Sequence, residues 1–477
     1  MNIEKLVRDS KVIAVVCNQW GDTGKGKIVD YLSENVDVIA RGTGGNNAGH
    51  TVILNGREKI FHLLPTGILK DSQGKKTILG NGMVIDLQAL CTEIDELDHE
   101  KLSYNNLMIS KDASLIMPYH IEMDKAKNQS QKDGGIGSTG RGIGPCYTDK
   151  IARRGIFMED LFNKDKLTKK ILRDSEFYSR QKINVEEIID ELDPYISRIK
   201  PFVRDTVSEM HKSLRQGKKI LLEGAQGLLL SVEHGTYPYV TSSDCSLNGT
   251  CSGVGISARV VDLPLGVFKF PFMTRVGAGP FPTELGGRSS EEYCAAGTEH
   301  DILFELEKYG VSFTKENGCI KYNHHDPKII ELMNSNDSFT QGVGIRLAAK
   351  EYGATTGRPR RTGWTDLISA RYAININGPL MVLTKPDSIS GIEKFKLGHN
   401  YKNGDSIVED FSKDGEFLKK VIPTFITYKG YRDISSVRKY DELPSSLQTA
   451  IRDFENFTGG ETVAISVGAE KDAIIFK

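Results

Sequence analysis

The first apolar run of the chain leads into a glycine-rich loop that carries an aspartate and two lysines. The run is Val12–Cys17, and residues 18–27 read Asn-Gln-Trp-Gly-Asp-Thr-Gly-Lys-Gly-Lys. A strand, a glycine turn, a lysine and a helix N-terminus can hold a phosphate, because backbone N–H groups and the helix dipole face the anion and Lys25 adds a point charge. The spacing departs from the G-x-x-x-x-G-K-[ST] motif. The loop is therefore either a variant phosphate-binding loop or a surface turn.

A lysine and an aspartate follow another apolar run, Leu380–Thr384. They are Lys385 and Asp387, in the order Lys-Pro-Asp. In P-loop GTPases such a pair binds guanine: the carboxylate accepts hydrogen bonds from the ring N–H and the exocyclic amine, and the lysine stem covers the base. Adenine lacks this pair of donors and would leave the carboxylate unpaired, so the arrangement discriminates between the two bases. Lys-x-Asp alone is common, and it gains weight only together with the loop at residues 18–27.

Glycine is concentrated in further loops between apolar runs. The chain has 48 glycines in 477 residues, and the average share of glycine in proteins is about 7%. The additional clusters lie at residues 42–45, 134–144, 224–227, 277–279 and 353–363. Glycine is placed where the backbone turns sharply or approaches a ligand, and several of these clusters also carry Lys, Arg, Thr or Asp. We therefore interpret the group as backbone that surrounds polar small molecules.

The elements that must position these loops alternate between strand and helix. The pattern predicts buried strands at residues 12–17, 36–40, 219–222, 380–384 and 463–466, and helices at 28–32 and 445–457. It also predicts a helical stretch at 185–214 with interruptions at Pro194 and Pro201, and a hairpin that turns at Asn55-Gly56. The predicted fold class is α/β: a large, mostly parallel central sheet flanked by helices, similar to P-loop NTPases, with small inserted subdomains. In such a sheet, ligands bind beyond the carboxyl ends of the strands.

The composition argues against several classes of protein. Lys and Arg number 62 and Asp and Glu number 63, and this net charge of −1 argues against nucleic acid as the main partner. The hydrophobic share of 39% and the charged share of 26% are those of a globular chain. No apolar run approaches the roughly 18–20 residues that span a bilayer, and the N-terminus lacks the layout of a signal peptide. Seven cysteines without Cys-x-x-Cys spacing favour a reducing cytoplasm over a disulfide framework.

Several blocks of the sequence resemble the adenylosuccinate synthetase family. They follow the family's order, and each is long and rare; they lie at residues 19–27, 44–51, 140–145, 234–243, 275–284 and 353–358. The resemblance implies a single domain over residues 1–477. It also implies a GTP- and Mg²⁺-dependent condensation of IMP with L-aspartate, which gives adenylosuccinate, GDP and phosphate in purine biosynthesis.

The resemblance assigns the catalytic chemistry to a few residues. Hypoxanthine O6 is a poor leaving group, so it is first phosphorylated to 6-phosphoryl-IMP and then displaced by the amine of aspartate. Asp22 would remove the N1 proton as general base and would bind Mg²⁺ together with the carbonyl of Gly49. His50 would stabilise charge on the transferred phosphoryl group, and Lys25 would hold the nucleotide phosphates. Without the resemblance, Asp22 and His50 would be interpreted as turn residues.

The resemblance also assigns three binding sites. The GTP site would comprise Gly21, Gly24, Lys25, Gly26, Lys385, Asp387, Ser466 and Gly468. The IMP site would comprise Asn47, Thr139, Gln226, Thr241, Arg358 and Arg153, the last donated by the second subunit of a homodimer. The aspartate site would comprise Thr355, Thr356, Arg358 and Arg360. Two guanidinium groups suit a dicarboxylate because each can bind one carboxylate bidentately. Taken alone, residues 150–154 would be a solvated basic stretch, and residues 357–361 an exposed basic turn or a nucleic-acid patch.

The sequence departs from the family pattern at four places. Thr23, Thr43 and Tyr431 stand where the family usually has Glu, Gln and Trp. Residues 286–345 form an atypical insertion, in a stretch that is much shorter in typical members and directly precedes the aspartate loop. We expect this insertion to be a surface subdomain that packs near the aspartate loop and modulates its closure. A metal site at Cys319 and His324-His325 is not expected, because a fourth spaced partner is lacking.

Two other functions remain open on the sequence alone. One is a paralogue with changed substrates, which joins an amino acid to another purine nucleotide; the Thr23 departure and the insertion leave room for it. The other is a non-catalytic, GTP-binding regulatory protein. Loss of Asp22, Lys25 or His50 would favour the second function, and all three residues are present.

Overall fold

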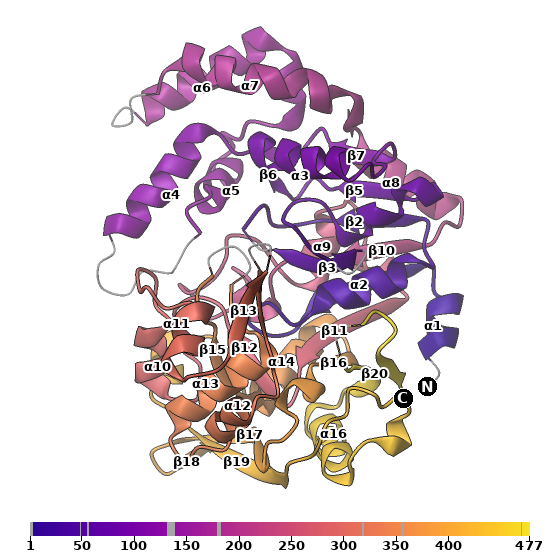
Figure 1. The fold of residues 1–477 in the computed structure, drawn as a ribbon. Helices are drawn as coiled ribbons and strands as arrows, with labels where there is room; N and C mark the ends of the chain where they lie inside the picture. The colour runs from indigo at the N-terminus through magenta and orange to yellow at the C-terminus, as the bar shows by residue number, and fades with distance from the viewer. Residues whose placement is uncertain are drawn as a thin grey trace.

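A ten-stranded sheet runs through the middle of the molecule (Figure 1). The protein is seen as a computed structural model that describes residues 3–47, 49–54, 57–130, 139–178, 183–316, 319–353, 357–468 and 470–477. Neighbouring strands of the sheet are parallel, except that β20 and β21 are antiparallel. In spatial order the strands are β21 (Ile474–Phe476), β20 (Glu461–Ser466), β16 (Leu380–Thr384), β11 (Leu263–Lys269), β1 (Val12–Cys17), β10 (Ile220–Glu223), β2 (Val38–Arg41), β5 (Lys76–Leu79), β7 (Leu107–Ser110) and β9 (Val203–Arg204).

The strand β1 lies at the centre of the sheet because its sequence is apolar on both faces. All of its residues are buried. Its register pairs Val12 with Ile220 of β10 and Ile13 with Leu263 of β11. A strand that is covered on both faces belongs in the middle of a parallel sheet, so the loop that follows β1 lies between the loops that follow β10 and β11.

Helices cover both faces of the sheet and extend into two lobes (Figure 1). The upper lobe in Figure 1 holds α4 to α7, and the lower lobe holds α10 to α13. The helices are α1 (Ile3–Asp9), α2 (Lys25–Ser33), α3 (Leu87–His99), α4 (Pro118–Ser130), α5 (Ile143–Ile151), α6 (Lys164–Phe177), α7 (Val185–Ile199), α8 (Thr206–Arg215), α9 (Leu247–Ser252), α10 (Gly287–Tyr293), α11 (Ile302–Lys308), α12 (Pro327–Met333), α13 (Ser338–Ala349), α14 (Leu367–Asn377), α15 (Gly415–Leu418) and α16 (Ser445–Thr458).

Smaller sheets accompany the central one. The largest of them joins β12 (Phe272–Arg275), β15 (Arg361–Asp366), β17 (Lys394–Asn403), β18 (Ser406–Val408) and β19 (Ile422–Lys429). Two-stranded sheets are formed by β3 (His50–Leu54) with β4 (Arg57–Phe61), β6 (Val84–Ile85) with β8 (Ser114–Leu115), and β13 (Phe313–Glu316) with β14 (Cys319–Tyr322). None of the helices in the described part of the chain combines the length and the apolar character that crossing a membrane requires.

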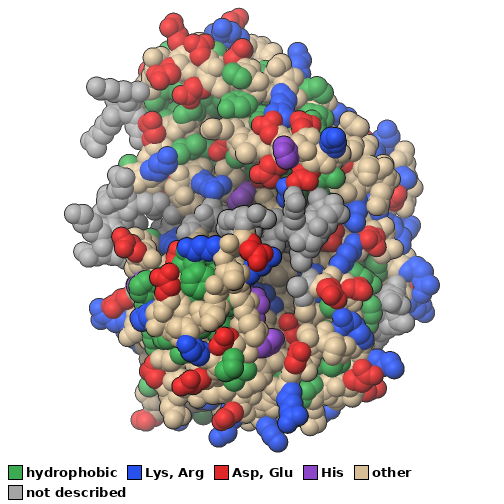
Figure 2. All heavy atoms as spheres, viewed as in Figure 1, with side chains coloured by type: hydrophobic (Ala, Val, Ile, Leu, Met, Phe, Trp, Pro, Cys, Tyr) green, Lys and Arg blue, Asp and Glu red, His purple; other side chains and the backbone are tan. Residues whose placement is uncertain are grey.

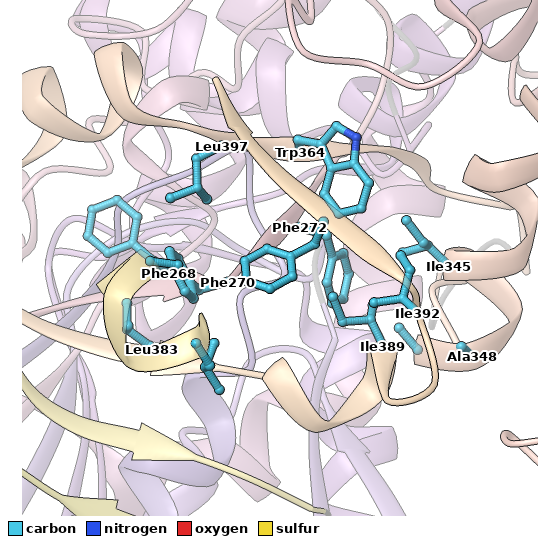
Figure 3. Close-up of a cluster of buried hydrophobic side chains, with 14 of the residues drawn as sticks. Phe268, Phe270, Phe272, Ile345, Ala348, Trp364, Leu383, Ile389, Ile392 and Leu397 are labelled. Atoms are coloured by element: carbon cyan, nitrogen blue, oxygen red, sulfur yellow. The ribbon is translucent and has the colours of Figure 1, made fainter. Parts of the chain in front are cut away.

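Residues 286–345 share the main hydrophobic core. Leu306 of α11, Ile329 and Met333 of α12, and Ile345 of α13 are fully buried in the same cluster as the phenylalanines of β11 and β12. Figure 3 shows side chains of α13 beside those of the β16–β17 connection and of β12: Ile345, Ala348, Ile389, Ile392 and Phe272. The segment therefore packs onto the body of the molecule through a common core, although parts of its surface are exposed.

The predicted elements are largely confirmed, including the α/β class with a mostly parallel sheet. Strands form at each predicted place, and β3 and β4 pair antiparallel on either side of the predicted turn, which lies outside the described residues. The predicted interruption at Pro194 is wrong, because α7 continues through this residue. Pro194 is exposed, so the carbonyl that it leaves without an N–H partner faces solvent, while Ile188, Leu192 and Ile199 anchor both ends of the helix in the core.

Candidate functional site

The phosphate-loop candidate joins β1 to α2 at the carboxyl edge of the sheet. Gly21, Asp22 and Gly24 have positive φ angles of 87°, 49° and 78°, so the loop turns sharply before the helix starts at Lys25. Lys25 is buried at the first position of α2, and Gly26 follows it. The hydroxyl of Thr384 donates a hydrogen bond of 2.7 Å to the carbonyl of Thr23, which attaches the loop to the end of β16. The loop has the backbone turn and the helix N-terminus that phosphate binding requires.

The four predicted guanine-site residues lie together at the ends of β16 and β20. The backbone N–H of Lys385 donates to the carbonyl of Ser466 (3.2 Å), and the backbone N–H of Gly468 bonds to the carboxylate of Asp387. Burial raises the pKa of Asp387, while the hydrogen bond from Gly468 opposes this rise. A half-buried carboxylate in this position would be well desolvated once a base covers it.

Lys27 links the phosphate loop to the guanine corner, the name used below for the predicted guanine-site residues Lys385, Asp387, Ser466 and Gly468. From α2 its Nζ donates to the carbonyls of Val467 (3.4 Å), Gly468 (3.0 Å) and Ala473 (3.0 Å). Burial lowers the pKa of Lys27 to about 8, and Asp387 counteracts part of this effect. The sequence motif contained Lys27, but no pattern in the sequence revealed its contact with a segment near the C-terminus.

Asn47 and Gln226 form the first part of the predicted IMP site. They follow the neighbouring strands β2 and β10, and Gln226 Nε2 donates to Asn47 Oδ1 at 2.9 Å. Gly44 makes room for this contact, since a Cβ at that position would lie 2.9 Å from Gln226 Oε1. Gln226 adopts φ 49°, and its buried Oε1 has no hydrogen-bond partner within the described residues. An unpaired buried amide oxygen beside a glycine loop is the kind of group that a ligand satisfies.

The remaining predicted IMP residues lie on the segments around this pair. Arg141, two positions after Thr139, donates from Nη1 to the carbonyl of Asn46 at 2.9 Å and thereby links its loop to the Asn47 loop. The backbone N–H of Thr241 donates to Leu230 O at 2.8 Å, in the segment that follows Gln226. Arg153 differs from the others: it is exposed, with φ 62°, just beyond the end of α5. The side chain of Arg153 is thus accessible from outside its own chain.

The aspartate-site arginine Arg360 contacts the predicted general base. Its Nη2 lies 2.8 Å from Asp22 Oδ2, and the side chains of Arg360 and Asp22 are 14% and 28% exposed. The base of the aspartate loop is paired: Arg360 N donates to Glu351 O at 2.9 Å, and Tyr352 and Pro359 form an isolated β-bridge. Burial lowers the pKa of Arg358, which is half-buried in the same loop. Thr355, Thr356 and the side chain of His50 lie outside the described residues.

Two buried charged residues of this region were missed by the sequence interpretation. Glu351 contacts Arg360 Nη1 at 2.6 Å, Lys385 Nζ at 2.7 Å and Lys269 Nζ at 2.5 Å. Lys269 is the last residue of β11 and is fully buried. The only signal for Lys269 was a lysine at the end of an apolar run, and Glu351 stood next to a glycine cluster without any distinguishing spacing.

The three substituted positions, Thr23, Thr43 and Tyr431, are all buried and carry hydroxyl groups. Thr23 and Thr43 are buried, and their Oγ1 atoms have no hydrogen-bond partner within the described part of the chain. Tyr431 is buried beside the guanine corner, where its hydroxyl donates to the carbonyl of Pro386 at 2.8 Å. Among the described residues, no cluster of three or more His, Cys, Asp or Glu side chains is arranged for a metal ion.

The site opens onto one face of the molecule. Figure 2 shows this face hollowed between the upper and lower lobes, with both basic and acidic side chains around the hollow. Because β1, β2, β10, β11, β16 and β20 are parallel neighbours, the loops after them share the carboxyl edge of the sheet. The glycine loops, together with Lys25, Lys385 and Arg360, therefore lie at the edge of the sheet where ligands bind in folds of this kind.

Fold and site together define a P-loop-like α/β protein that is built to bind a purine nucleotide and a further anionic substrate. The family model described as adenylosuccinate synthetase matches residues 14–475. The adenylosuccinate synthetase of Thermodesulfovibrio yellowstonii is 38% identical over 98% of each chain. That of Halothermothrix orenii is 37% identical over 96% of this chain and 97% of the relative. The chain belongs to the adenylosuccinate synthetase family, in which GTP drives the ligation of L-aspartate to IMP.

Solved structures agree with this assignment. A fully ligated adenylosuccinate synthetase from Plasmodium falciparum matches with a TM-score of 0.81 at 32% identity, and covers 98% of this chain and 100% of that chain. The succinoaminodeoxyadenylate synthetase of cyanophage S-2L has a TM-score of 0.54 at 18% identity, over 98% of this chain and 95% of that chain. The second similarity shows a shared fold alone.

Proposed function

We propose that this protein ligates L-aspartate to IMP at the expense of GTP, through a 6-phosphoryl-IMP intermediate, and releases adenylosuccinate, GDP and phosphate. The observation that carries the proposal is the 2.8 Å contact between Asp22 and Arg360. It joins the residue proposed as general base to a residue proposed to bind aspartate, directly beside the phosphate loop. The family membership and the full-length relatives support the same activity.

The first chemical step is the phosphorylation of O6. Asp22 accepts the N1 proton of bound IMP, which makes O6 nucleophilic, and O6 attacks the γ-phosphorus of GTP while the bond to the β-phosphate oxygen breaks. Lys25 and the backbone N–H groups at the start of α2 stabilise the phosphate charge. Asn47 and Gln226 hold IMP in place through their amide groups.

The second step is the displacement of phosphate from C6. The amine of aspartate attacks C6, the C6–O6 bond breaks, phosphate departs with both electrons, and the amine loses a proton. Arg358 and Arg360 orient the two substrate carboxylates, and we assign Thr355 and Thr356 to the same substrate on the resemblance alone. We assign to His50 the stabilisation of charge on the phosphoryl group in both steps.

The chain offers a minimal set of ligands for Mg²⁺. The Asp22 carboxylate is partly exposed in the turn before α2, and the backbone carbonyl of Gly49 precedes β3. This sparse set fits Mg²⁺, which usually takes one or two carboxylates together with substrate phosphates and waters rather than a cage made only of protein groups. When bound, the ion would neutralise phosphate charge during the transfer.

The activity can be measured directly by the change in ultraviolet absorbance as the 6-amino product forms. With IMP, GTP, Mg²⁺ and aspartate, we expect turnover by the wild-type protein and a loss of at least about 100-fold in the Asp22→Asn variant, which cannot accept the N1 proton. The matched control is Asp30→Asn, a partly exposed carboxylate on the helix α2 that follows the Asp22 loop, which should keep near wild-type activity. Undiminished turnover by the Asp22→Asn protein would contradict the proposed role of the base.

We further propose a cytoplasmic homodimer in which Arg153 reaches the IMP phosphate of the partner's site. The exposure of Arg153 at the end of α5 supports a role outside its own subunit. The cysteines that the structure describes are free thiols, as suits a reducing compartment. Neither alternative is favoured: a paralogue that joins an amino acid to another purine nucleotide, or a non-catalytic GTP-binding protein. The proposed acid–base and nucleotide-binding residues are all present, and the relatives carry the same name over their full length.

We also propose that residues 286–345 are an insertion that supports the aspartate loop. Glu305 of α11 is fully buried and lies 2.5 Å from Arg346 Nη2, and Tyr352 donates its hydroxyl to the same carboxylate. Arg346 Nη1 in turn donates to the carbonyl of Arg360 at 3.0 Å. These contacts connect the insertion to the base of the loop that carries Arg358 and Arg360.

A further inference from the structure

A single buried carboxylate, Glu351, is shared by three cations that come from three separate segments. Its side chain is fully buried. Lys385 Nζ lies 2.7 Å from Oε1, while Arg360 Nη1 and Lys269 Nζ lie 2.6 Å and 2.5 Å from Oε2. Lys385 belongs to the guanine corner and Arg360 to the aspartate loop, so Glu351 lies between the two sites in space.

The cations keep Glu351 ionised. Burial alone would raise the pKa of Glu351, but Lys269, Lys385 and Arg360 outweigh burial and hold this pKa well below its ordinary value. Burial lowers the pKa of Lys269 to about 7, and Glu351 opposes this decrease. Lys269 is also fixed by a hydrogen bond of 2.6 Å to the hydroxyl of Thr274. One anion and one immobile lysine therefore form a fixed centre, to which Lys385 and Arg360 attach.

Arg360 divides its guanidinium group between two carboxylates. Nη1 contacts Glu351 and Nη2 contacts Asp22. The side chain of Glu351 is fully buried, while that of Asp22 is 28% exposed. A substrate carboxylate can therefore replace Asp22 on the Nη2 edge, whereas Glu351 keeps hold of the Nη1 edge. This exchange would release Asp22 for its work on the purine ring.

Lys385 divides its ammonium group in a similar way. Its Nζ donates to the carbonyl of Ala349 at 2.9 Å as well as to Glu351. A guanine base that the Lys385 stem covers would draw this ammonium group away from Glu351. Glu351 would then draw the guanidinium group of Arg360 toward itself and away from Asp22, because these charges interact at short distance in a poorly screened interior. Asp22 is fixed in its loop and cannot follow, so the Nη2 edge loses its internal competitor and becomes free for a substrate carboxylate.

We propose that Glu351 is a positioning residue that couples the guanine-nucleotide site to the aspartate site. Occupation of the first site increases the affinity of the second through the shared carboxylate. This inference rests on the proposed function, since it takes Lys385 as the guanine contact and Arg360 as the aspartate contact. Coupling of this kind is reciprocal, so aspartate must raise the affinity for the guanine nucleotide by the same factor.

The test is the affinity for aspartate measured by calorimetry with IMP and Mg²⁺ present, in the absence and in the presence of a non-hydrolysable GTP analogue. For the wild-type protein we expect an increase of about tenfold in affinity when the analogue is bound. In Glu351→Gln, we expect the two affinities to agree within about twofold, because the neutral amide cannot redistribute charge between the two cations. A purely structural role would weaken both affinities and leave their ratio unchanged.

Two further variants keep the test decisive. Glu351→Asp retains the charge but withdraws it by one methylene group, and should give a ratio between those of the wild type and Glu351→Gln even if the latter folds poorly. The matched control is Asp160→Asn, which removes another fully buried carboxylate that binds two lysines, Lys166 and Lys170, outside the site, and should keep the wild-type ratio. A wild-type ratio in both Glu351 variants would overturn the coupling role, whereas absence of product formation by the wild-type protein would instead contradict the proposed function.

Discussion

At the scale of single residues, the charge of Asp22 is already engaged before any substrate is present. Arg360 Nη2 lies 2.8 Å from the carboxylate, which is 28% exposed. This ion pair occupies Oδ2 of Asp22 while Arg360 stays in place. The proposed base is thus restrained until a substrate carboxylate takes its place on Arg360, which limits wasteful transfer of phosphate to water.

The proposed choice of nucleotide rests on another carboxylate, that of Asp387. In Asp387→Asn the amide can no longer accept two hydrogen bonds from guanine but can donate one to the C2 oxygen of xanthine. We expect the kcat/KM for GTP to fall by roughly 100-fold and that for XTP to rise above it, as measured in the same absorbance assay. Equal use of ATP and GTP by the wild-type protein would show that Lys385 and Asp387 do not discriminate between guanine and adenine.

At the scale of elements, the helix α5 ends in a polar network that holds the chain around Arg153. Asp149 is buried, accepts hydrogen bonds from His120 Nε2 (3.0 Å) and Tyr178 Oη (2.5 Å), and pairs with Arg154 Nη2 at 2.6 Å. The assignment of His120 Nε2 as the donor follows from the hydrogen bond that Nδ1 accepts from Met117 N. The network fixes Arg154, and with it the left-handed backbone of Arg153.

This network should make the stability of the protein depend on pH in the acidic range. Burial would raise the pKa of Asp149, but the hydrogen bonds from His120, Tyr178 and Arg154 prevail and lower it to about 2. A lowered pKa stabilises the folded state above the unfolded value near 3.8, and this stabilisation is lost as the pH falls toward 2. Asp149→Asn should reduce the free energy of unfolding at neutral pH by about 2 kcal/mol and flatten its decrease between about pH 5 and pH 3, as measured by urea denaturation. The control Asp193→Asn, at an exposed position of α7, should leave both unchanged.

The predicted elements differ in how far the local sequence determines them. Apolar runs such as Val12–Cys17 predicted their strands well, since burial on both faces leaves little alternative for such a run. Pro194 shows the limit, because its effect depends on whether the carbonyl that it frees reaches solvent, and this is a property of the packed helix. The site was predictable where glycine loops mark it, but Glu351 and Lys269 were not, since their roles arise from contacts between distant segments.

At the scale of the whole molecule, the resemblance indicated many of the site residues, and the fold explains why they meet. The loops after β1, β2, β10, β11, β16 and β20 are far apart in the sequence and adjacent at one edge of the sheet. The placement of residues 286–345 in the main core was not predictable from their sequence, which has no strong periodicity to reveal a shared core. Arg153 is exposed in the single chain, and its proposed role concerns the assembly.

A mixing experiment tests that role. Asp22→Asn and Arg153→Ala proteins should each be nearly inactive, but a heterodimer of the two would contain one site with wild-type Asp22 and wild-type Arg153. After unfolding and joint refolding of an equal mixture, we expect about a quarter of the wild-type activity, as random pairing of a symmetric dimer predicts. Mixed protein as inactive as its two parents would show that Arg153 does not act across the subunits.

The bonds from Lys27 to Val467, Gly468 and Ala473 have a consequence for how the protein is made. Lys27 and Gly468 are separated by 441 positions, so the phosphate loop gains these contacts only after a segment synthesised much later has folded against α2. A chain that lacks the segment after β20 still contains the residues of β1 and α2. It lacks the part of the guanine corner that would contact the base, and it lacks the carbonyls that bind Lys27. We therefore expect nucleotide binding to require that the segment around Val467, Gly468 and Ala473 is folded against Lys27.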